Sequence, residues 1–202
     1  MMNYVNKKEL QPYKDLFNEG MIFMHEKIDE YKYNYRLVGS AKRNLVIEHH
    51  NKGFDLDYQI IFCESIQPKS SRELIEIKNR FRNIFNEFFV NKGYNYADDS
   101  TSAITIKYPD DSKIINSYDV VLLSPENDGY YVFKYQNEEK TIMSLAKVKN
   151  SLGFQKNYKK IKGNDMWSLL REKYRFKKNN NIKQKKSFSL LIEAVNETID
   201  TL

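Results

Sequence analysis

Two stretches in the first half of the chain repeat their apolar side chains every three to four residues. This spacing predicts amphipathic helices over 7–33 and 72–90. Because proline is tolerated only in the first turn of a helix, we expect the first helix to start near Gln11, just before Pro12. Gly20 weakens the middle of that helix and would allow it to divide in two.

Elsewhere the period falls to two, which is typical of strands that are buried on one face. We predict strands at 35–38, 54–63, 103–108, 113–123 and 130–135. A short helix is expected after the first strand, over 41–50. Helical spacing returns from Thr141 onward, and we expect helices over 167–174 and 187–199. This order predicts an α+β fold, in which helices flank a mixed, largely antiparallel sheet and a short helical extension follows.

The charge of the chain is concentrated at its C-terminal end. The formal net charge is +6, but residues 146–202 hold fourteen Lys and Arg against five Asp and Glu, so the remainder is about −3. We therefore predict a core over 1–145 and a basic helical extension over 146–202 packed on that core. A basic segment of this kind favours a polyanionic partner such as RNA or tRNA. The alternative interpretation is a solvated lysine-rich surface with no nucleic-acid partner.

Other features narrow the class of protein. No apolar stretch is long enough to span a bilayer, so no membrane partner is expected, and residues 1–10 are too polar for a signal peptide. Cys63 is the single cysteine, which excludes an intramolecular disulfide, and we expect it in the core at the end of a buried strand. These features predict a cytoplasmic protein.

The first candidate for chemistry is the sequence Asp55-Leu56-Asp57 on a predicted strand. Alternate side chains of a strand share a face, so both carboxylates point the same way. Neighbouring carboxylates repel each other unless a cation lies between them, and Mg²⁺ prefers such oxygen ligands. Taken alone the tripeptide is a weak signal, because exposed strand ends often carry two acids.

Gly39-Ser40 follows the first predicted strand. Glycine permits a tight turn with close backbone approach, and serine adds a hydroxyl donor. A helix opening at Ala41 would present free amides to an anion, with Lys42 and Arg43 beside it. An ordinary strand-to-helix turn is the alternative.

Asp119 interrupts a run of the sequence that otherwise predicts a buried strand. A buried carboxylate is costly unless it is paired or binds a metal ion. It is therefore the third candidate ligand, and an aspartate satisfied at the edge of the sheet is the alternative.

Together, Leu37-Val38-Gly39-Ser40, Phe54-Asp55-Leu56-Asp57 and Tyr118-Asp119-Val120-Val121 resemble the motifs of the DNA polymerase β-like nucleotidyltransferase superfamily. Within it, the chain is most similar to the oligoadenylate synthase and bacterial cGAS-like branch. The resemblance implies a nucleotidyltransferase core that transfers a nucleoside monophosphate from a nucleoside triphosphate, such as ATP, to an acceptor and releases pyrophosphate. The acceptor would be a nucleotide, RNA or tRNA, a protein or a small molecule, and a bacterial defence or toxin role would be compatible.

The resemblance also implies roles for the site residues. Asp55, Asp57 and Asp119 would hold two Mg²⁺ ions, for which Mn²⁺ could substitute, and Asp119 would receive the proton of the acceptor hydroxyl. Gly39 and Ser40, assisted by Lys42 and Arg43, would bind the phosphates. The alternative is a catalytically silent member of the same fold that binds nucleotide or RNA.

Overall fold

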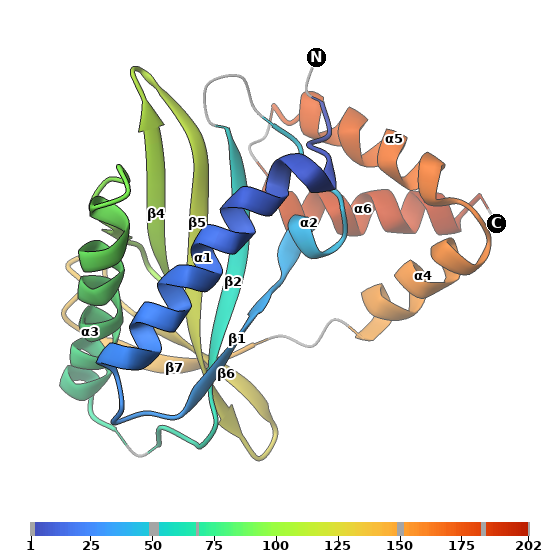
Figure 1. Ribbon diagram of the computed structural model, residues 1–202. Helices are drawn as coiled ribbons and strands as arrows, with labels where there is room; N and C mark the ends of the chain where they lie inside the picture. The colour runs from blue at the N-terminus through green and yellow to red at the C-terminus, as the bar shows by residue number, and fades with distance from the viewer. Residues whose placement is uncertain (1–2, 49–52, 68, 149–151, 183–184, 202) are drawn as a thin grey trace. The chain divides into compact units, whose positions relative to one another are not determined.

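The structure of the protein is a computed structural model, in which residues 3–48, 53–67, 69–148, 152–182 and 185–201 are described. The chain divides into two compact units. One unit is Val5–Val148, and the other consists of Lys149–Leu202 together with Met1–Tyr4. Figure 1 labels the helices and strands of both units.

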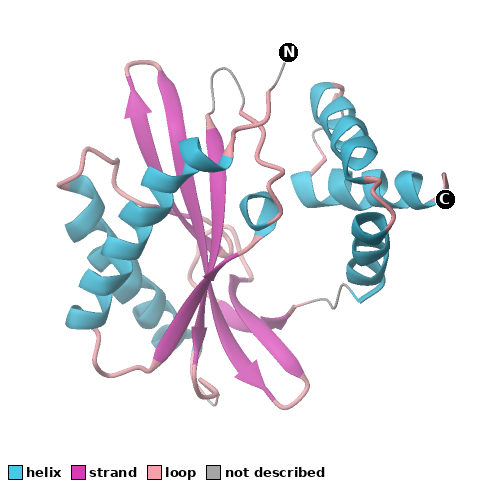
Figure 2. Cartoon of the chain, turned by 45° about the vertical axis from the view of Figure 1, so that its right-hand side comes forward, coloured by secondary structure: helices cyan, strands magenta, loops and turns pink. Residues whose placement is uncertain are grey.

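The larger unit contains a seven-stranded sheet and three helices. Its elements are α1 (Lys7–Lys27), β1 (Tyr33–Leu37), α2 (Gly39–Lys42), β2 (Phe54–Phe62), α3 (Ser71–Val90), β3 (Asp98–Asp99), β4 (Ala103–Asp110), β5 (Lys113–Glu126), β6 (Gly129–Tyr135) and β7 (Met143–Lys147). The strand order is β1-β2-β5-β4-β3, with β6 paired to β5 and β7 paired to β6. Only β2 and β5 pair in parallel among the described strands, and the other pairs are antiparallel. The predicted α+β fold with a mixed, largely antiparallel sheet is confirmed (Figure 2).

The first helix starts earlier than the sequence analysis predicts. Asn6 caps α1 by accepting from the Glu9 backbone, while the Glu9 side chain accepts from the Asn6 backbone. This capping box places Pro12 inside the helix and not in its first turn. Gly20 does not divide α1, which is continuous from Lys7 to Lys27. The absence of a side chain at Gly20 instead lets Phe88 and Phe89 of α3 pack closely against the helix.

Other predicted elements are wrong in extent or type. The helix expected over 41–50 is the single turn α2, which ends at Lys42, and residues 49–50 lie outside the described part of the chain. The segment expected to turn helical at Thr141 instead forms β7, an outer strand of the sheet. Cys63 is exposed and not in the core, because the neighbouring Phe62, the last residue of β2, takes the buried position and the next side chain points to the opposite side.

The main core lies between the sheet and the pair of helices α1 and α3 (Figure 1). Phe17 of α1 is fully buried and stacks on Tyr58 of β2, with ring centroids 3.6 Å apart. It also contacts Tyr118 of β5 and Phe89 of α3. Burying these aromatic rings on one face of the sheet removes a large apolar area from water and so stabilises this unit.

The smaller unit is helical. It contains α4 (Leu152–Gly163), α5 (Trp167–Asn179) and α6 (Ser187–Ile199), which Figure 2 shows in cyan. Its buried apolar side chains come mainly from α5 and α6 and include Leu170, Tyr174, Leu191, Ala194 and Val195. The helices expected over 167–174 and 187–199 are confirmed, although the first extends to Asn179. None of the helices in the described residues is both long and apolar enough to cross a membrane.

Candidate active site

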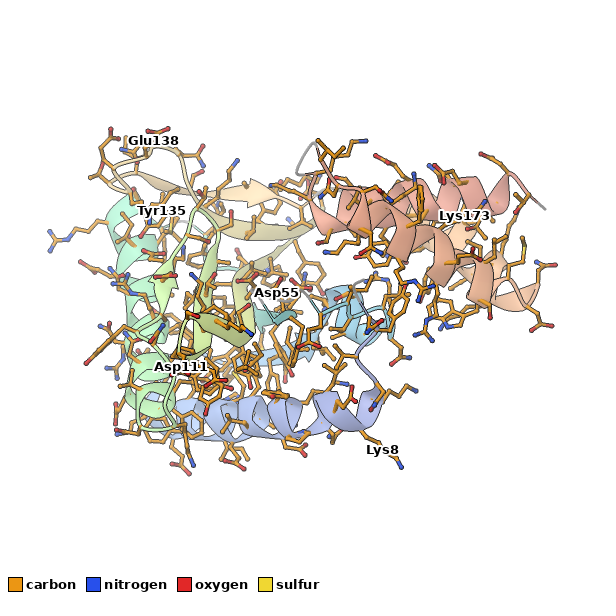
Figure 3. The ribbon with its side chains drawn as sticks, turned by 90° about the horizontal axis from the view of Figure 1, so that it is seen from above. Lys8, Asp55, Asp111, Tyr135, Glu138 and Lys173 are labelled. Carbon is orange, nitrogen blue, oxygen red and sulfur yellow. The ribbon has the colours of Figure 1, made fainter. Side chains whose placement is uncertain are left out.

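Strand β2 separates its apolar and acidic side chains onto opposite faces. Leu56 and Tyr58 are buried beneath α1, whereas Asp55 and Asp57 lie on the other face. Figure 3 shows the labelled Asp55 on the side of the strands that faces away from α1. The alternation of the strand therefore places both carboxylates on the face that α1 leaves open.

The parallel pairing of β2 with β5 brings the third acid beside the first two. Asp57 is in register with Asp119, and Asp55 is in register with Ser117. The Ser117 hydroxyl donates a hydrogen bond to Asp55 Oδ1. On the next strand, Thr105 is in register with Asp119, and its Oγ1 donates to Asp119 Oδ1 at 2.6 Å. The hydroxyl groups of Ser117 and Thr105 thus orient the carboxylates of Asp55 and Asp119, respectively.

The Gly39-Ser40 turn packs against the side chain of Asp57. Gly39 has a φ of +61°, and a Cβ atom added to it would lie 1.8 Å from Asp57 Oδ2. Only glycine can occupy this position without moving the carboxylate. The Ser40 backbone N–H donates to the Asp57 side chain, and the Val38 backbone N–H donates to the Asp57 carbonyl at 2.8 Å. Since α2 has only one turn, any anion here would bind to local amides and not to the dipole of a full helix.

Burial and neighbouring carboxylates raise the pKa of two of the three acids, Asp57 and Asp119. Burial, followed by the charges of Asp119 and Asp55, raises the pKa of Asp57 to about 6, and the Ser40 amide and the Arg43 charge only partly oppose this shift. The pKa of Asp119 is also raised, mainly by burial and also by the charge of Asp55, whereas the Thr105 hydrogen bond acts in the opposite direction. The site is therefore short of positive charge.

The predicted basic residues of the turn differ in their positions. Arg43 Nη1 donates to the Gly39 carbonyl at 2.7 Å, and its charge lowers the pKa of Asp57. Lys42 is exposed, and within the described part of the chain no ion pair or side-chain hydrogen bond joins it to the carboxylates. Lys107, which the sequence analysis did not single out, lowers the pKa of Asp119 and pairs with Asp98 at 2.6 Å.

The chemistry of the donor set fits Mg²⁺. The ligands of the ion would be the carboxylate oxygens of Asp55, Asp57 and Asp119 on one face of the sheet, where their negative charge is poorly compensated. Among the described residues, no group of three or more His, Cys, Asp or Glu side chains is already arranged to hold a metal ion by itself. Mg²⁺ does not require such a cage, since it is commonly held by one or two carboxylates, substrate phosphates and water.

Three site residues escape sequence reasoning because their roles depend on strand register. Thr105, Ser117 and Lys107 belong to no motif, and each meets an acid only through the pairing of β2, β3, β4 and β5. Alternation along each strand could have placed them on the acidic face, but not opposite a particular acid.

Comparison with solved structures identifies similar folds. The chain matches apo DncV from Vibrio cholerae with a TM-score of 0.62 and 15% identity, over 93% of this chain and 52% of DncV. GTP-bound V. cholerae DncV gives a TM-score of 0.60 and 14% identity, with the same coverage of 93% and 52%. Escherichia coli DncV in its 3'-deoxy GTP bound form gives 0.58 and 14%, over 96% of this chain and 54% of that one.

V. cholerae DncV is described as a cyclic AMP-GMP synthase and a prokaryotic cGAS homolog. The present chain therefore shares the fold of V. cholerae DncV, and the predicted resemblance is confirmed at the level of the fold. It spans about half the length of the DncV chains that it matches. No family model matches the chain, and no curated protein matches it.

Proposed function

We propose that the protein is a Mg²⁺-dependent nucleotidyltransferase that moves a nucleoside monophosphate from a nucleoside triphosphate to an acceptor and releases pyrophosphate. The observation that carries this proposal is the contact of the Gly39-Ser40 turn with Asp57, which is itself in register with Asp119. A tight amide-lined turn suits phosphate, and an uncompensated acidic cluster beside it suits a divalent cation. The fold shared with DncV, which has been solved with GTP bound, supports the same substrate class.

Asp55, Asp57 and Asp119 would hold the magnesium ions, and the turn would bind the outer phosphates. When bound, the metal would neutralise charge on the phosphates and favour loss of the proton from the acceptor hydroxyl. Burial is the main cause of the raised pKa of Asp57 and Asp119, and neighbouring carboxylates add to it. A bound cation would offset both effects.

In the transfer, the acceptor oxygen forms a bond to the α-phosphorus, while the bond from that phosphorus to the bridging oxygen of pyrophosphate breaks. Asp119 is our candidate for receiving the hydroxyl proton, because the family resemblance makes it the acid nearest the acceptor. Thr105 occupies Asp119 Oδ1 as a donor and thereby orients the carboxylate. Most of the catalysis in such reactions comes from positioning and electrostatic stabilisation.

RNA is the acceptor class that the smaller unit favours. Helix α4 contains no Asp or Glu, and its Lys156, Lys159 and Lys160 side chains are exposed. No ion pair joins these three lysines to an acid in the described part of the chain. By contrast, Lys177 of α5 is paired with Glu193 and Glu197. An uncompensated row of lysines on one helix would bind the phosphates of an RNA acceptor.

The proposal is tested by measuring pyrophosphate release from each ribonucleoside triphosphate with Mg²⁺, in the presence and absence of bulk tRNA. We expect release by the wild-type chain, its loss in Asp55→Ala/Asp57→Ala, and its retention in a matched control, Asp110→Ala/Asp111→Ala, at the end of β4. Stimulation by tRNA that Lys156→Glu/Lys159→Glu abolishes would identify RNA as the acceptor. Binding of triphosphate without release under any condition would indicate a silent binding protein and contradict the proposed enzyme.

A further inference from the structure

Gln59 of β2 and Arg36 of β1 form a polar pair on the same face of the sheet as the acids. Gln59 follows Asp57 by two residues on β2, so their side chains point the same way about 7 Å apart. Gln59 is in register with Arg36 of β1, whose chain continues into the Gly39-Ser40 turn. A ribose can bridge this distance between the phosphate position and the polar pair.

The hydrogen bond within the pair fixes which groups remain for a ligand. Arg36 Nε donates to Gln59 Oε1 at 2.9 Å. Because arginine has only donors, Gln59 must turn its oxygen toward Arg36, which leaves its amide N–H groups available. The outer nitrogens of Arg36 are also donors, and no carboxylate in the described residues forms an ion pair with this guanidinium.

The surroundings of the pair suit a flat aromatic ligand. The Arg36 guanidinium lies over the ring of Tyr130 on β6, 5.7 Å from its centroid, and this contact holds the guanidinium plane in place. On the other side of Gln59, the same row of the sheet continues with Val121 of β5 and Ala103 of β4. These small apolar side chains would form a floor beside the donor groups.

We propose that Arg36 and Gln59 read the base of the bound nucleotide and select guanine. This inference rests on the proposed function, since it assumes that the phosphates of the nucleotide lie at the Gly39-Ser40 turn. The two residues are specificity-determining and take no part in the bond-making step.

Guanine follows from the pattern of donors. The pair offers only donors, and guanine presents two adjacent acceptors, O6 and N7, on one edge. The corresponding edge of adenine places the N6 amino donor beside N7, so one of the protein donors would face another donor. Arg36 is exposed and Gln59 is half-buried in the free chain, so the base would have to cover these donors on binding. A donor that the ligand covers without accepting from it weakens binding, and this asymmetry is the source of the selectivity.

The test is equilibrium binding by calorimetry of GTP and ATP analogues with a methylene group between the α- and β-phosphates, in the presence of Mg²⁺. These analogues bind without transfer. A bidentate contact discriminates by an amount that corresponds to a factor of roughly 5 to 150 in affinity, so we expect the wild-type chain to prefer the GTP analogue by about tenfold or more.

Two variants localise the preference. Gln59→Glu keeps the acceptor for Arg36 but replaces the amide donor with a carboxylate oxygen, so affinity for the GTP analogue should fall about tenfold and the preference should vanish. Arg36→Met should weaken the same preference and leave Gln59 free to rotate. The matched controls Gln67→Glu and Arg72→Lys change exposed residues outside this face and should behave as wild type. Thermal unfolding checks that each variant is folded.

The outcomes separate this inference from the proposed function. Equal affinities of the wild-type chain for both analogues, or a guanine preference that survives in both Gln59→Glu and Arg36→Met, would overturn base reading by this pair. Pyrophosphate release that still depends on Asp57 would then leave the proposed function standing. Failure of the wild-type chain to bind either analogue would overturn both.

Discussion

The two faces of strands β2 and β5 use the same backbone for opposite purposes. On one face, Tyr58 and Tyr118 are buried against Phe17 in a cluster of aromatic rings. On the other face, Asp57 and Asp119 stand side by side, and each raises the free energy of the folded chain by being ionised close to a like charge. The aromatic face stabilises the sheet enough to tolerate the repulsion that the acidic face needs in order to attract a cation.

This division leads to a simple expectation for substitutions. A change on the acidic face should reduce activity and leave stability intact or improved, whereas a change on the aromatic face should reduce stability first. Because side chains alternate along a strand, residues next to each other in sequence should behave in opposite ways.

The largest effect is expected for Asp119→Asn. Asparagine has the same shape and can still accept from Thr105, but it lacks the charge to bind a metal ion and cannot take up the acceptor proton. We expect pyrophosphate release to fall by about a thousandfold or more, with an unfolding midpoint no lower than that of the wild type. Activity within about tenfold of wild type would show that Asp119 is not in the catalytic machinery.

Phe17→Ala should produce the largest loss of stability. Phe17 is fully buried and contacts rings from β2, β5 and α3, so its removal leaves a cavity. We expect the free energy of unfolding to fall by about 4 kcal/mol, measured by urea denaturation. The exposed Phe176→Ala, in the helical unit, is the matched control and should change it by less than about 1 kcal/mol. A small effect of Phe17→Ala would mean that the aromatic face does not dominate the stability of the sheet.

Asp57→Asn should stabilise the metal-free chain. The pKa of Asp57 is raised from 3.8 to about 6, so the folded chain binds this proton more tightly than the unfolded chain does. Stability is therefore lost as the pH rises from about 4 to about 6, and the full penalty remains above that window. We expect the variant to gain about 3 kcal/mol in the free energy of unfolding at pH 7.5 and almost nothing at pH 4. A destabilised variant at pH 7.5 without metal would contradict the proposed cost of burying this charge beside the other carboxylates.

Thr105→Val should have the smallest of these effects. Valine keeps the shape and strand preference of threonine but cannot donate to Asp119 Oδ1. Loss of one orienting hydrogen bond should reduce kcat by about tenfold with little change in KM. Thr105→Ser, which restores a hydroxyl, should recover most of the activity, and an equal loss in both variants would argue against an orienting role.

Local sequence patterns predict the acidic and aromatic faces of the inner strands, but they predict neither the outer strand β7 nor the register between strands. Alternation in 54–63 and the apolar run in 113–123 are strong enough to locate β2 and β5 and to place Asp55, Asp57 and Asp119 on strands. Five-residue β7 lies at the outer edge of the sheet and is mostly half-buried, so its pattern lacks the period of two that marks the inner strands.

Contacts between distant segments explain the remaining differences. Thr105 meets Asp119, and Ser117 meets Asp55, only once the register of three strands is known. The start of α1 was predictable in principle, because Asn6 and Glu9 have the spacing of a capping box, but Pro12 suggests a later start. Gly39 predicts a turn from the sequence alone. Only the fold shows that Asp57 leaves no room for a side chain at this position.

The most direct test of the acidic face is a crystal structure of the chain with Mn²⁺ and a non-transferable triphosphate analogue, using the anomalous signal of manganese. We expect manganese within coordinating distance of Asp57 and Asp119, with the triphosphate against Gly39 and Ser40. Manganese absent from these carboxylates, or a triphosphate bound elsewhere on the chain, would contradict the assignment of this face as the site of nucleotidyl transfer.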